Sequence, residues 1–231
     1  ETIESGTKAA AAGGFTRVAT MPNTKPVIDS AIIVDGLKYK IAAEGVVKVD
    51  IIGSLSKGLE GKELSSMGGM AKAGVVAFSD DGRYVQNCDF MRKAMEYAGM
   101  FGKIVIDHCE DADLIEGGHM HEGVVSHELG LKGRPAVAED IAVARDILLA
   151  EATGTAVHIA HISTKNAVQM VRQAKAKGLK VTAEATPQHM ILTDEALRSY
   201  DPRFKVNPPL RSEEHRKAVV EGLVDGTIDA I

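Results

Sequence analysis

Residues Ile104-Val105-Ile106-Asp107-His108-Cys109-Glu110-Asp111 give the clearest indication of the fold class, because a short apolar run ends directly in acidic and histidine side chains. Two other segments repeat the pattern: residues 75–78 lead into Ser79-Asp80-Asp81-Gly82, and residues 157–160 lead into His161. In a (β/α)₈ barrel the C-terminal ends of the strands converge on one rim, where active sites are built. Asp and His on such a rim are natural ligands of a divalent metal. The repetition therefore predicts the middle of a metal-dependent hydrolase barrel.

Strand-like and helix-like segments alternate along the rest of the chain. The predicted strands cover residues 17–20, 46–52, 75–78, 103–107, 156–160, 180–183 and 228–231. The predicted helices cover residues 2–12, 31–43, 62–73, 89–98, 138–152, 166–176 and 215–224, with a short extra helix at 194–199. Apolar strands joined by helices indicate a parallel sheet. An open doubly wound sheet would accept the same elements, but it would not place candidate catalytic groups on so many strand tips.

The predicted fold class is therefore α/β, a (β/α)₈ TIM-like barrel of the metal-dependent hydrolase type. The strand count makes it incomplete: the first strand is expected to be missing and the last to be truncated at its C-terminal end. Residues 1–231 are expected to form a single partial domain of this kind.

The composition is that of an ordinary soluble globular protein. Of the 231 residues, 45% are hydrophobic and 26% charged, which suffices for one large α/β domain. The formal net charge of -5 and the lack of a Lys/Arg cluster argue against a nucleic-acid partner. No apolar stretch approaches the roughly 20 residues that span a bilayer, so no membrane partner is expected. Cys88 and Cys109 fit free thiols in a reducing compartment, which predicts a cytoplasmic protein.

Several of the candidate ligands also have an ordinary structural interpretation. Asp80 and Asp81 are adjacent on a strand, so at most one faces the barrel mouth, and Asp81-Gly82 is by itself a turn signal. His108 could equally be a loop histidine beside helix-capping acids. His158 and His161 point to opposite faces of a regular strand. His161, at the tip, is the better ligand, and His158 is expected to be a buried structural residue.

The remaining histidines are weaker candidates. His119, His121 and His127 lie in a glycine-rich region, and we expect flexible loop residues there rather than a metal motif. His215 is expected on a solvated helix face, and His189 is left open. Cys109 lacks an evident base partner, so a Cys/His nucleophile pair is only weakly supported.

Two asparagines follow predicted strands or extended loops. Asn23 ends the segment Thr20-Met21-Pro22-Asn23, and Asn207 begins Asn207-Pro208-Pro209-Leu210-Arg211. Their amides offer donors and an acceptor to a substrate carboxylate or amide, although each segment alone would be interpreted as a turn. Taken together, the Asp and His side chains at successive strand tips have the layout of a metal held from several strands, with an open position for water.

These motifs closely resemble those of the bacterial dihydroorotase family of the amidohydrolase superfamily. The matching segments, spread over nearly the whole chain, are residues 14–24, 78–82, 108–111, 134–139, 161–164 and 207–211. The resemblance implies a distorted (β/α)₈ barrel with one or two zinc ions. It also implies reversible interconversion of L-dihydroorotate and N-carbamoyl-L-aspartate in pyrimidine biosynthesis. Small-molecule substrates, a homodimer, and aspartate transcarbamoylase as a further partner are expected on the same ground.

The resemblance also assigns roles by motif position. Asp81, His108 and His161 would bind metal, and Asn23 and Asn207 would contact substrate. The family's first-strand His-x-His pair with its substrate-binding arginine would lie before Glu1. Its general-base aspartate would lie beyond Ile231, so no catalytic residue is assigned and the chain alone is expected to be inactive.

Two alternatives stay open. Hydantoinases and allantoinases are cyclic amidohydrolases of the same superfamily, but they use a carbamylated lysine as the metal bridge, and no lysine occurs at the Asp80-Asp81 strand end. The other alternative is a non-catalytic dihydroorotase-like subunit that scaffolds aspartate transcarbamoylase. Such subunits lose metal ligands, whereas Asp81, His108 and His161 are present here.

Overall fold

The computed structural model describes residues 2–231, which divide into two compact units with the boundary between Ile106 and Asp107. Each unit combines parallel strands with helices. Among the described residues, no helix combines the length and apolar character that crossing a bilayer requires.

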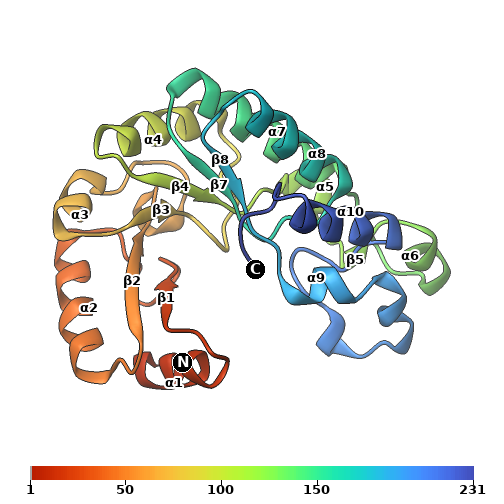
Figure 1. The fold of residues 1–231 in the computed structure, drawn as a ribbon, viewed down its shortest axis with the longest axis horizontal. Coiled ribbons are helices and arrows are strands. Elements are labelled where there is room, and N and C mark those ends of the chain that lie inside the picture. The colour runs from red at the N-terminus through yellow and green to blue at the C-terminus, as the bar shows by residue number, and fades with distance from the viewer. Residues whose placement is uncertain (1) are drawn as a thin grey trace. The chain divides into compact units, whose positions relative to one another are not determined.

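The first unit is a four-stranded parallel sheet with its connecting helices (Figure 1). Its elements are α1 (Ile3–Ala12), β1 (Arg17–Thr20), α2 (Ala31–Glu44), β2 (Lys48–Gly53), η1 (Lys57–Leu59), α3 (Met67–Ala73), β3 (Ala77–Ser79), α4 (Cys88–Met100) and β4 (Ile104–Asp107). The strands pair in chain order, with Thr20 opposite Ile51 and Ser79 opposite Ile106. Their C-terminal ends therefore lie at the same edge of the sheet.

Helix α4 illustrates why the sequence folds this way locally. The Asn87 side chain caps its N-terminus by accepting the Phe90 N–H at 3.0 Å. Its buried residues recur at helical spacing: Phe90, Met91, Ala94, Met95 and Ala98. The charged residues of the opposite face stay in solvent, so the helix covers one side of the sheet.

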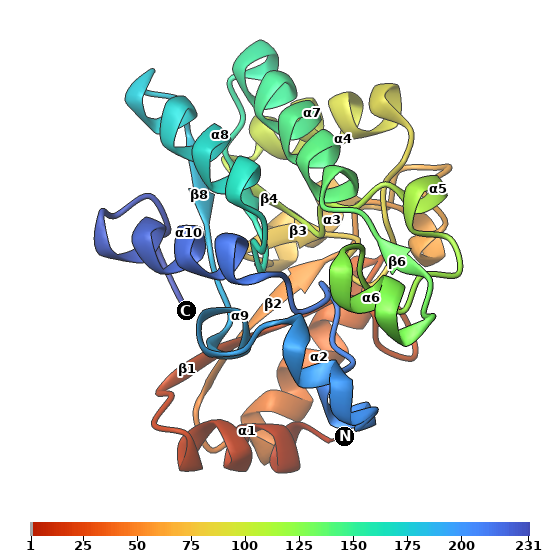
Figure 2. The ribbon, with the colours of Figure 1, turned by 90° about the vertical axis from the view of Figure 1, so that its right-hand side faces the viewer.

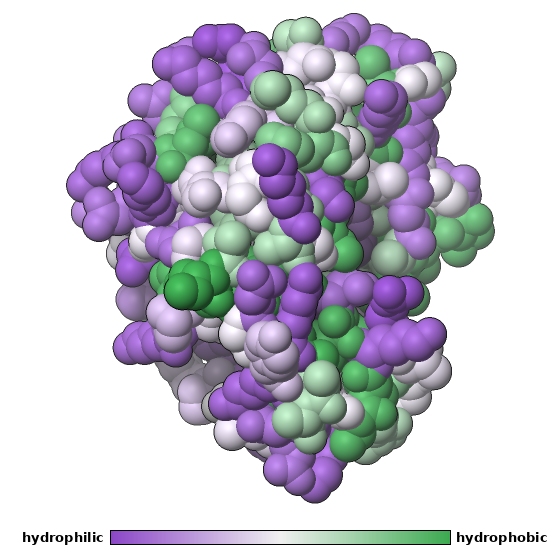
Figure 3. Space-filling model, turned by 90° about the vertical axis from the view of Figure 1, so that its left-hand side faces the viewer, coloured by the Kyte–Doolittle hydropathy of each residue, from purple (hydrophilic) through white to green (hydrophobic). Residues whose placement is uncertain are grey.

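The packing against the sheet is close around the glycine that ends β2. A Cβ atom on Gly53 would lie 3.0 Å from the Met70 sulfur and 3.1 Å from the Phe78 ring. On the face shown in Figure 3, hydrophobic side chains form separate patches among hydrophilic ones.

The second unit continues the alternation and adds a small sheet. Its elements are α5 (Ala112–Ile115), β5 (Met120–His121), α6 (Val124–Leu129), β6 (Gly133–Arg134), α7 (Val137–Thr153), β7 (Val157–Ile159), α8 (Lys165–Ala176), β8 (Val181–Ala183), α9 (Pro187–Ile191), η2 (Asp194–Ser199), η3 (Pro202–Phe204) and α10 (Glu213–Val224). Strands β7 and β8 pair in parallel, and α8 packs between α7 and α10 (Figure 2). The Ala160 N–H donates to the Asp107 carbonyl at the end of β4, so the order of the main strands is β1-β2-β3-β4-β7-β8.

Two features differ from the sequence prediction. The predicted strand 228–231 is reduced to a single parallel bridge between Glu184 and Ala230, because only Ala230 has a strand partner there. The short parallel pair of β5 and β6 was not predicted, since two-residue strands carry no periodic signal. Met120 of β5 forms a small hydrophobic cluster with Val125, Leu197 and Leu210.

Candidate metal centre

The two adjacent aspartates after β3 have different surroundings. Asp80 is 1% exposed, and its Oδ1 accepts the N–H groups of Leu55 at 2.8 Å and Ser56 at 3.0 Å. The Ser56 hydroxyl donates to its other oxygen. Burial raises the pKa of Asp80 to about 6, although these hydrogen bonds oppose the shift. Asp80 therefore stabilises the loop after β2 by hydrogen bonding to Leu55 and Ser56.

Asp81 lies at the turn that follows, where its N–H donates to the Ser79 hydroxyl at 3.0 Å. Gly82 has φ +82°, and a Cβ atom there would lie 3.0 Å from the side-chain nitrogen of Asn23. The exposed Asn23 side chain thus lies against the Asp81-Gly82 turn within the first unit. The segment forms a turn and also brings together two of the predicted site residues.

In the second unit, the structure brings His108 and His161 together. Their ring centroids are 4.3 Å apart and the rings meet edge to face at 75°. His108 follows β4 and is buried, and His161 follows β7 and is half-buried. The backbone of His161 has φ 35°, in the left-handed region that a non-glycine residue rarely adopts.

Asn207, predicted from the sequence to bind substrate, also reaches His108. Its side-chain nitrogen lies 3.3 Å from His108 Nε2, and its Oδ1 accepts a hydrogen bond of 2.7 Å from Arg134 Nη1. A guanidinium can only donate, so the carbonyl oxygen of Asn207 faces Arg134 and its NH₂ group faces His108. Arg134 fixes the orientation of the amide.

Glu110 completes this polar group, and sequence reasoning assigned no role to Glu110 or Arg134. The buried Glu110 Oε2 lies 3.4 Å from His108 Nε2 and 3.5 Å from Arg134 Nη1. Arg134 is held in turn by donating from Nε to the Gly118 carbonyl at 3.0 Å. The position of Glu110, two residues beyond His108 at the same strand tip, was the available signal. Arg134 begins the family-like segment 134–139, but its contacts lie far along the chain, so the sequence did not indicate its role.

A second network, also not foreseen, surrounds the loop after His161. Glu139 Oε1 accepts the N–H groups of Ser163 at 2.7 Å and Thr164 at 3.0 Å. The Ser163 hydroxyl donates to Glu139 Oε2, which lies 3.4 Å from Arg211 Nη2. Arg211 also donates to Ser163 Oγ and to the Arg134 carbonyl, both at 3.0 Å.

The prediction that His121 is a flexible loop residue is wrong. His121 belongs to β5, is 6% exposed, and meets the His215 ring edge to face with centroids 5.3 Å apart. Burial, Arg211 and His215 lower the pKa of His121 to about 3. His119 and His127 are exposed, as expected of loop residues.

The prediction of a solvated face for His215 is also wrong. It is half-buried, and its Nδ1 accepts the Lys165 N–H at 2.9 Å. His189, left open by the sequence, is buried and bonded through Thr186 Oγ1 at 2.7 Å and the Pro208 carbonyl at 2.9 Å. His158 is half-buried beside Thr182 Oγ1 at 2.8 Å, in a structural setting.

A further buried group, Asp107, Cys109 and Asp146, also has donor atoms close enough for a metal. Arg145 already places its guanidinium there, 2.8 Å from Asp107 Oδ2 and 2.7 Å from Asp146 Oδ1. Burial and the two carboxylates raise the pKa of the Cys109 thiol well above its usual value. This thiol is therefore a poor nucleophile, and the group is a structural ion-pair cluster.

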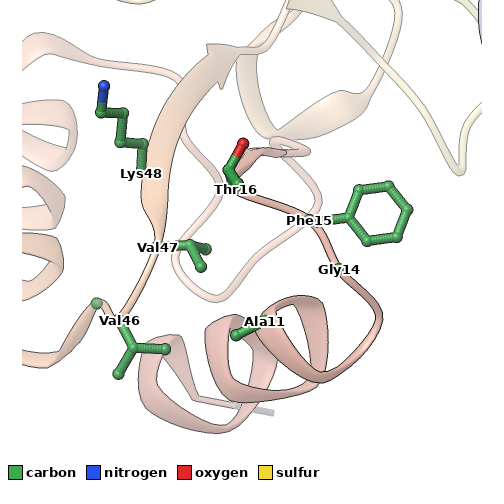
Figure 4. A pocket seen from close by; sticks show the side chains of 8 residues that line it. Ala11, Gly14, Phe15, Thr16, Val46, Val47 and Lys48 are labelled. Atoms are coloured by element: carbon green, nitrogen blue, oxygen red, sulfur yellow. The ribbon is translucent and has the colours of Figure 1, made fainter.

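The cavity in Figure 4 lies away from the strand tips. It measures about 580 Å³ and is lined by residues around the N-terminal ends of β1 and β2, among them Phe15, Thr16 and Val46. In Figure 4 the Phe15 ring projects away from β2. Because the predicted ligands follow the C-terminal strand ends, this cavity is a separate feature.

The donor set at the strand tips suits a borderline divalent ion. Two imidazoles from neighbouring strands supply nitrogen ligands, and carboxylates lie at the tips of β3 and β4. Nitrogen and oxygen donors in this combination are those that a divalent metal ion accepts.

Comparison with known proteins agrees with this geometry. A family model described as Dihydro-orotase-like matches residues 1–167. Curated dihydroorotases of Pelotomaculum thermopropionicum and Geobacter metallireducens are 58% and 54% identical over all 231 residues. The chain spans about half the length of these relatives, 54% in each case.

Solved structures resemble the chain in fold. An L-hydantoinase from Arthrobacter aurescens has a TM-score of 0.84 at 23% identity, covering 98% of this chain and 52% of its own. A D-hydantoinase from Thermus sp. has a TM-score of 0.76 at 25% identity, covering 99% and 52%. The predicted fold class, a partial barrel of the hydrolase type, is confirmed.

Proposed function

The chain belongs to the dihydroorotase-like family, and from this we propose that the complete protein is a dihydroorotase. The reaction is the reversible hydrolysis of L-dihydroorotate to N-carbamoyl-L-aspartate, a step of pyrimidine biosynthesis. The observation that carries the proposal is the pair of buried His108 and half-buried His161 after β4 and β7, whose ring centroids lie 4.3 Å apart, in a chain 58% identical to a curated dihydroorotase.

One or two zinc ions are proposed as the cofactor, with His108, His161 and Asp81 as ligands. The strand register supports the inclusion of Asp81, since Ser79 pairs with Ile106 and the two ligands follow two residues beyond each. A bound zinc ion would supply a hydroxide near neutral pH and polarise the scissile carbonyl. Asp80 is excluded as a ligand because its carboxylate already accepts hydrogen bonds from Leu55 and Ser56.

The asparagines are proposed to orient the substrate. Asn207 presents its NH₂ group toward His108, where it can donate to a carboxylate or a ring carbonyl. Asn23 is exposed beside the Asp81-Gly82 turn and offers the same chemistry from the first unit. Both contribute by holding the reacting amide in place. A homodimer, aspartate transcarbamoylase as a partner and a cytoplasmic location remain predictions.

The experiment is turnover by the complete protein carrying this chain, assayed with dihydroorotate, hydantoin and allantoin. We expect hydrolysis of dihydroorotate, lost with a zinc chelator and restored by zinc, and little turnover of the other two. Preferred turnover of hydantoin or allantoin would assign another cyclic amidohydrolase. A zinc-loaded protein inactive on all three would favour the scaffold subunit.

A further inference from the structure

The loop that carries His161 has an uncommon backbone. The φ of 35° at His161 is unfavourable for a residue with a side chain, so surrounding contacts must maintain it. Immediately after it, the N–H groups of Ser163 and Thr164 converge on one oxygen of Glu139, at 2.7 and 3.0 Å. These bonds fix the chain two residues beyond the imidazole.

Glu139 is suited to this role because it is buried and its bonds are charge-assisted. Glu139 and Arg211 are each 2% exposed, and a carboxylate at that depth is retained only when hydrogen-bonded and paired with an opposite charge. Ser163 supplies the hydrogen bonds, through its backbone N–H and its hydroxyl, and the Arg211 guanidinium at 3.4 Å supplies the opposite charge. Such hydrogen bonds are roughly twice as strong as neutral ones.

Arg211 extends the network to the other side of the site. It lies four residues after Asn207 in the chain, and it donates to Ser163 Oγ and to the Arg134 carbonyl at 3.0 Å each. Arg134 in turn binds the Asn207 amide at 2.7 Å. The loops bearing His161, Asn207 and Arg134 are thereby tied to one buried ion pair.

We infer that Glu139 and Arg211 are positioning residues, which hold His161 and Asn207 against His108 in the geometry that binds metal and substrate. The inference deepens the proposed function and rests on it for the identity of the substrate. Outer contacts that orient metal ligands typically change metal affinity 10–100-fold when removed.

The test compares two carboxylate-to-amide variants of the complete protein. Glu139→Gln removes the negative charge and places an NH₂ group where Oε2 accepts the Ser163 hydroxyl and faces Arg211, while its remaining carbonyl oxygen is the only acceptor left for the backbone N–H groups. Asp140→Asn is the matched control, because Asp140 is the next residue, is also buried, and binds the side chains of Thr164 at 2.5 Å and Asn166 at 2.9 Å rather than the His161 loop backbone. Zinc affinity is measured by chelator competition, and ligand geometry by the visible spectrum of the cobalt-substituted protein.

For Glu139→Gln we expect at least tenfold weaker zinc binding and an altered cobalt spectrum, while Asp140→Asn keeps both at wild-type values. Wild-type zinc affinity and spectrum in Glu139→Gln, or equal losses in the two variants, would overturn the inference. If Glu139→Gln does not fold, Ser163→Ala removes only a hydroxyl from the network and should weaken zinc binding in the same direction. An unchanged affinity there would count against it.

A metal-free readout separates this inference from the proposed function. In a crystal structure of metal-free Glu139→Gln we expect the His161 backbone to leave φ 35° and the ring pair to separate beyond 4.3 Å. An unchanged ring pair would overturn the inference even in an active dihydroorotase. An inactive wild-type protein with a disrupted ring pair in the variant would overturn the function and leave the inference standing.

Discussion

The imidazole rings of His108 and His161 lie edge to face, with their centroids 4.3 Å apart, although 53 positions separate the residues in the chain (161 − 108). Both follow parallel strands, and the Ala160 N–H binds the Asp107 carbonyl immediately before each histidine. Backbone pairing therefore places the two rings at one edge of the sheet.

Replacing either histidine should remove zinc. For His108→Ala and His161→Ala we expect at least tenfold weaker zinc binding in the complete protein, because each removes one nitrogen ligand. Metal analysis after dialysis measures it. His158→Gln is the control, since His158 bonds Thr182 instead. Full zinc retention by both alanine variants would contradict the proposed site.

Substitution of Asp80 should mainly lower stability, whereas substitution of Asp81 should mainly weaken metal binding. Asp80→Asn replaces one carboxylate oxygen by an NH₂ group. Either the Leu55 and Ser56 N–H groups or the Ser56 hydroxyl then lose their acceptor, so we expect a loss of about 1–3 kcal/mol in the free energy of unfolding. Asp81→Asn should weaken zinc binding and cost less stability than Asp80→Asn, because Asp81 is half-buried whereas Asp80 is buried. Urea unfolding and metal analysis of both variants provide the comparison. The reverse pattern would exchange the two roles.

Glycine at position 82 should matter for two reasons. Gly82 has φ +82°, and an added Cβ would lie 3.0 Å from the Asn23 amide. Gly154 has φ +69° with nothing within 4 Å, so Gly154→Ala isolates the backbone cost, about 1 kcal/mol. We expect Gly82→Ala to cost more than Gly154→Ala in urea unfolding and to raise KM for dihydroorotate. Equal stability losses and an unchanged KM would show that the Asn23 contact is unimportant.

The buried His121 should make stability depend on pH. Its pKa falls from 6.5 to about 3 in the folded state, so below pH 6.5 the unfolded chain takes up a proton that the folded chain does not. Its stabilising contribution is complete above pH 6.5 and is lost as pH falls toward 3, by up to about 1.4 kcal/mol per pH unit.

The measurement is urea unfolding of wild type and His121→Gln between pH 4 and 7, a range set by that shift. The variant should be less stable at pH 7 and should lose less stability on acidification. His127→Gln, at an exposed position, should keep the wild-type slope. A slope that His121→Gln leaves intact would mean that another group, such as the neighbouring His215, dominates.

Arg134 should act through Asn207. Arg134→Met removes the donor that orients the Asn207 amide and the positive charge 3.5 Å from Glu110. Loss of one hydrogen bond to a charged group corresponds to about a tenfold rise in KM for dihydroorotate. Steady-state kinetics check it, with Arg203→Met, an exposed arginine paired to Asp201, as the control. An unchanged KM would show that Asn207 does not need this partner.

The parallel α/β alternation, and the strand ends at which Asp81, His108 and His161 lie, could be predicted from the amino-acid sequence. These features are local, since an apolar run, a helix cap and a polar residue after a strand are all readable within about ten positions. The predicted strand at 228–231 was wrong because strand formation depends on a partner, and only Ala230 has one.

The sequence could not distinguish the polar residues that stabilise the fold from those that lie at the candidate site, because that depends on tertiary contacts. Asp80 and Asp81 are adjacent residues of the same type, and their roles differ because Leu55 and Ser56 donate hydrogen bonds to Asp80. His121 lies in a glycine-rich stretch that predicts a loop, but it belongs to β5 and its ring packs against His215. Glu139 and Arg211 are 72 positions apart in the chain. Burial and long-range hydrogen bonding depend on segments that meet only after folding, so local sequence carries no signal for them.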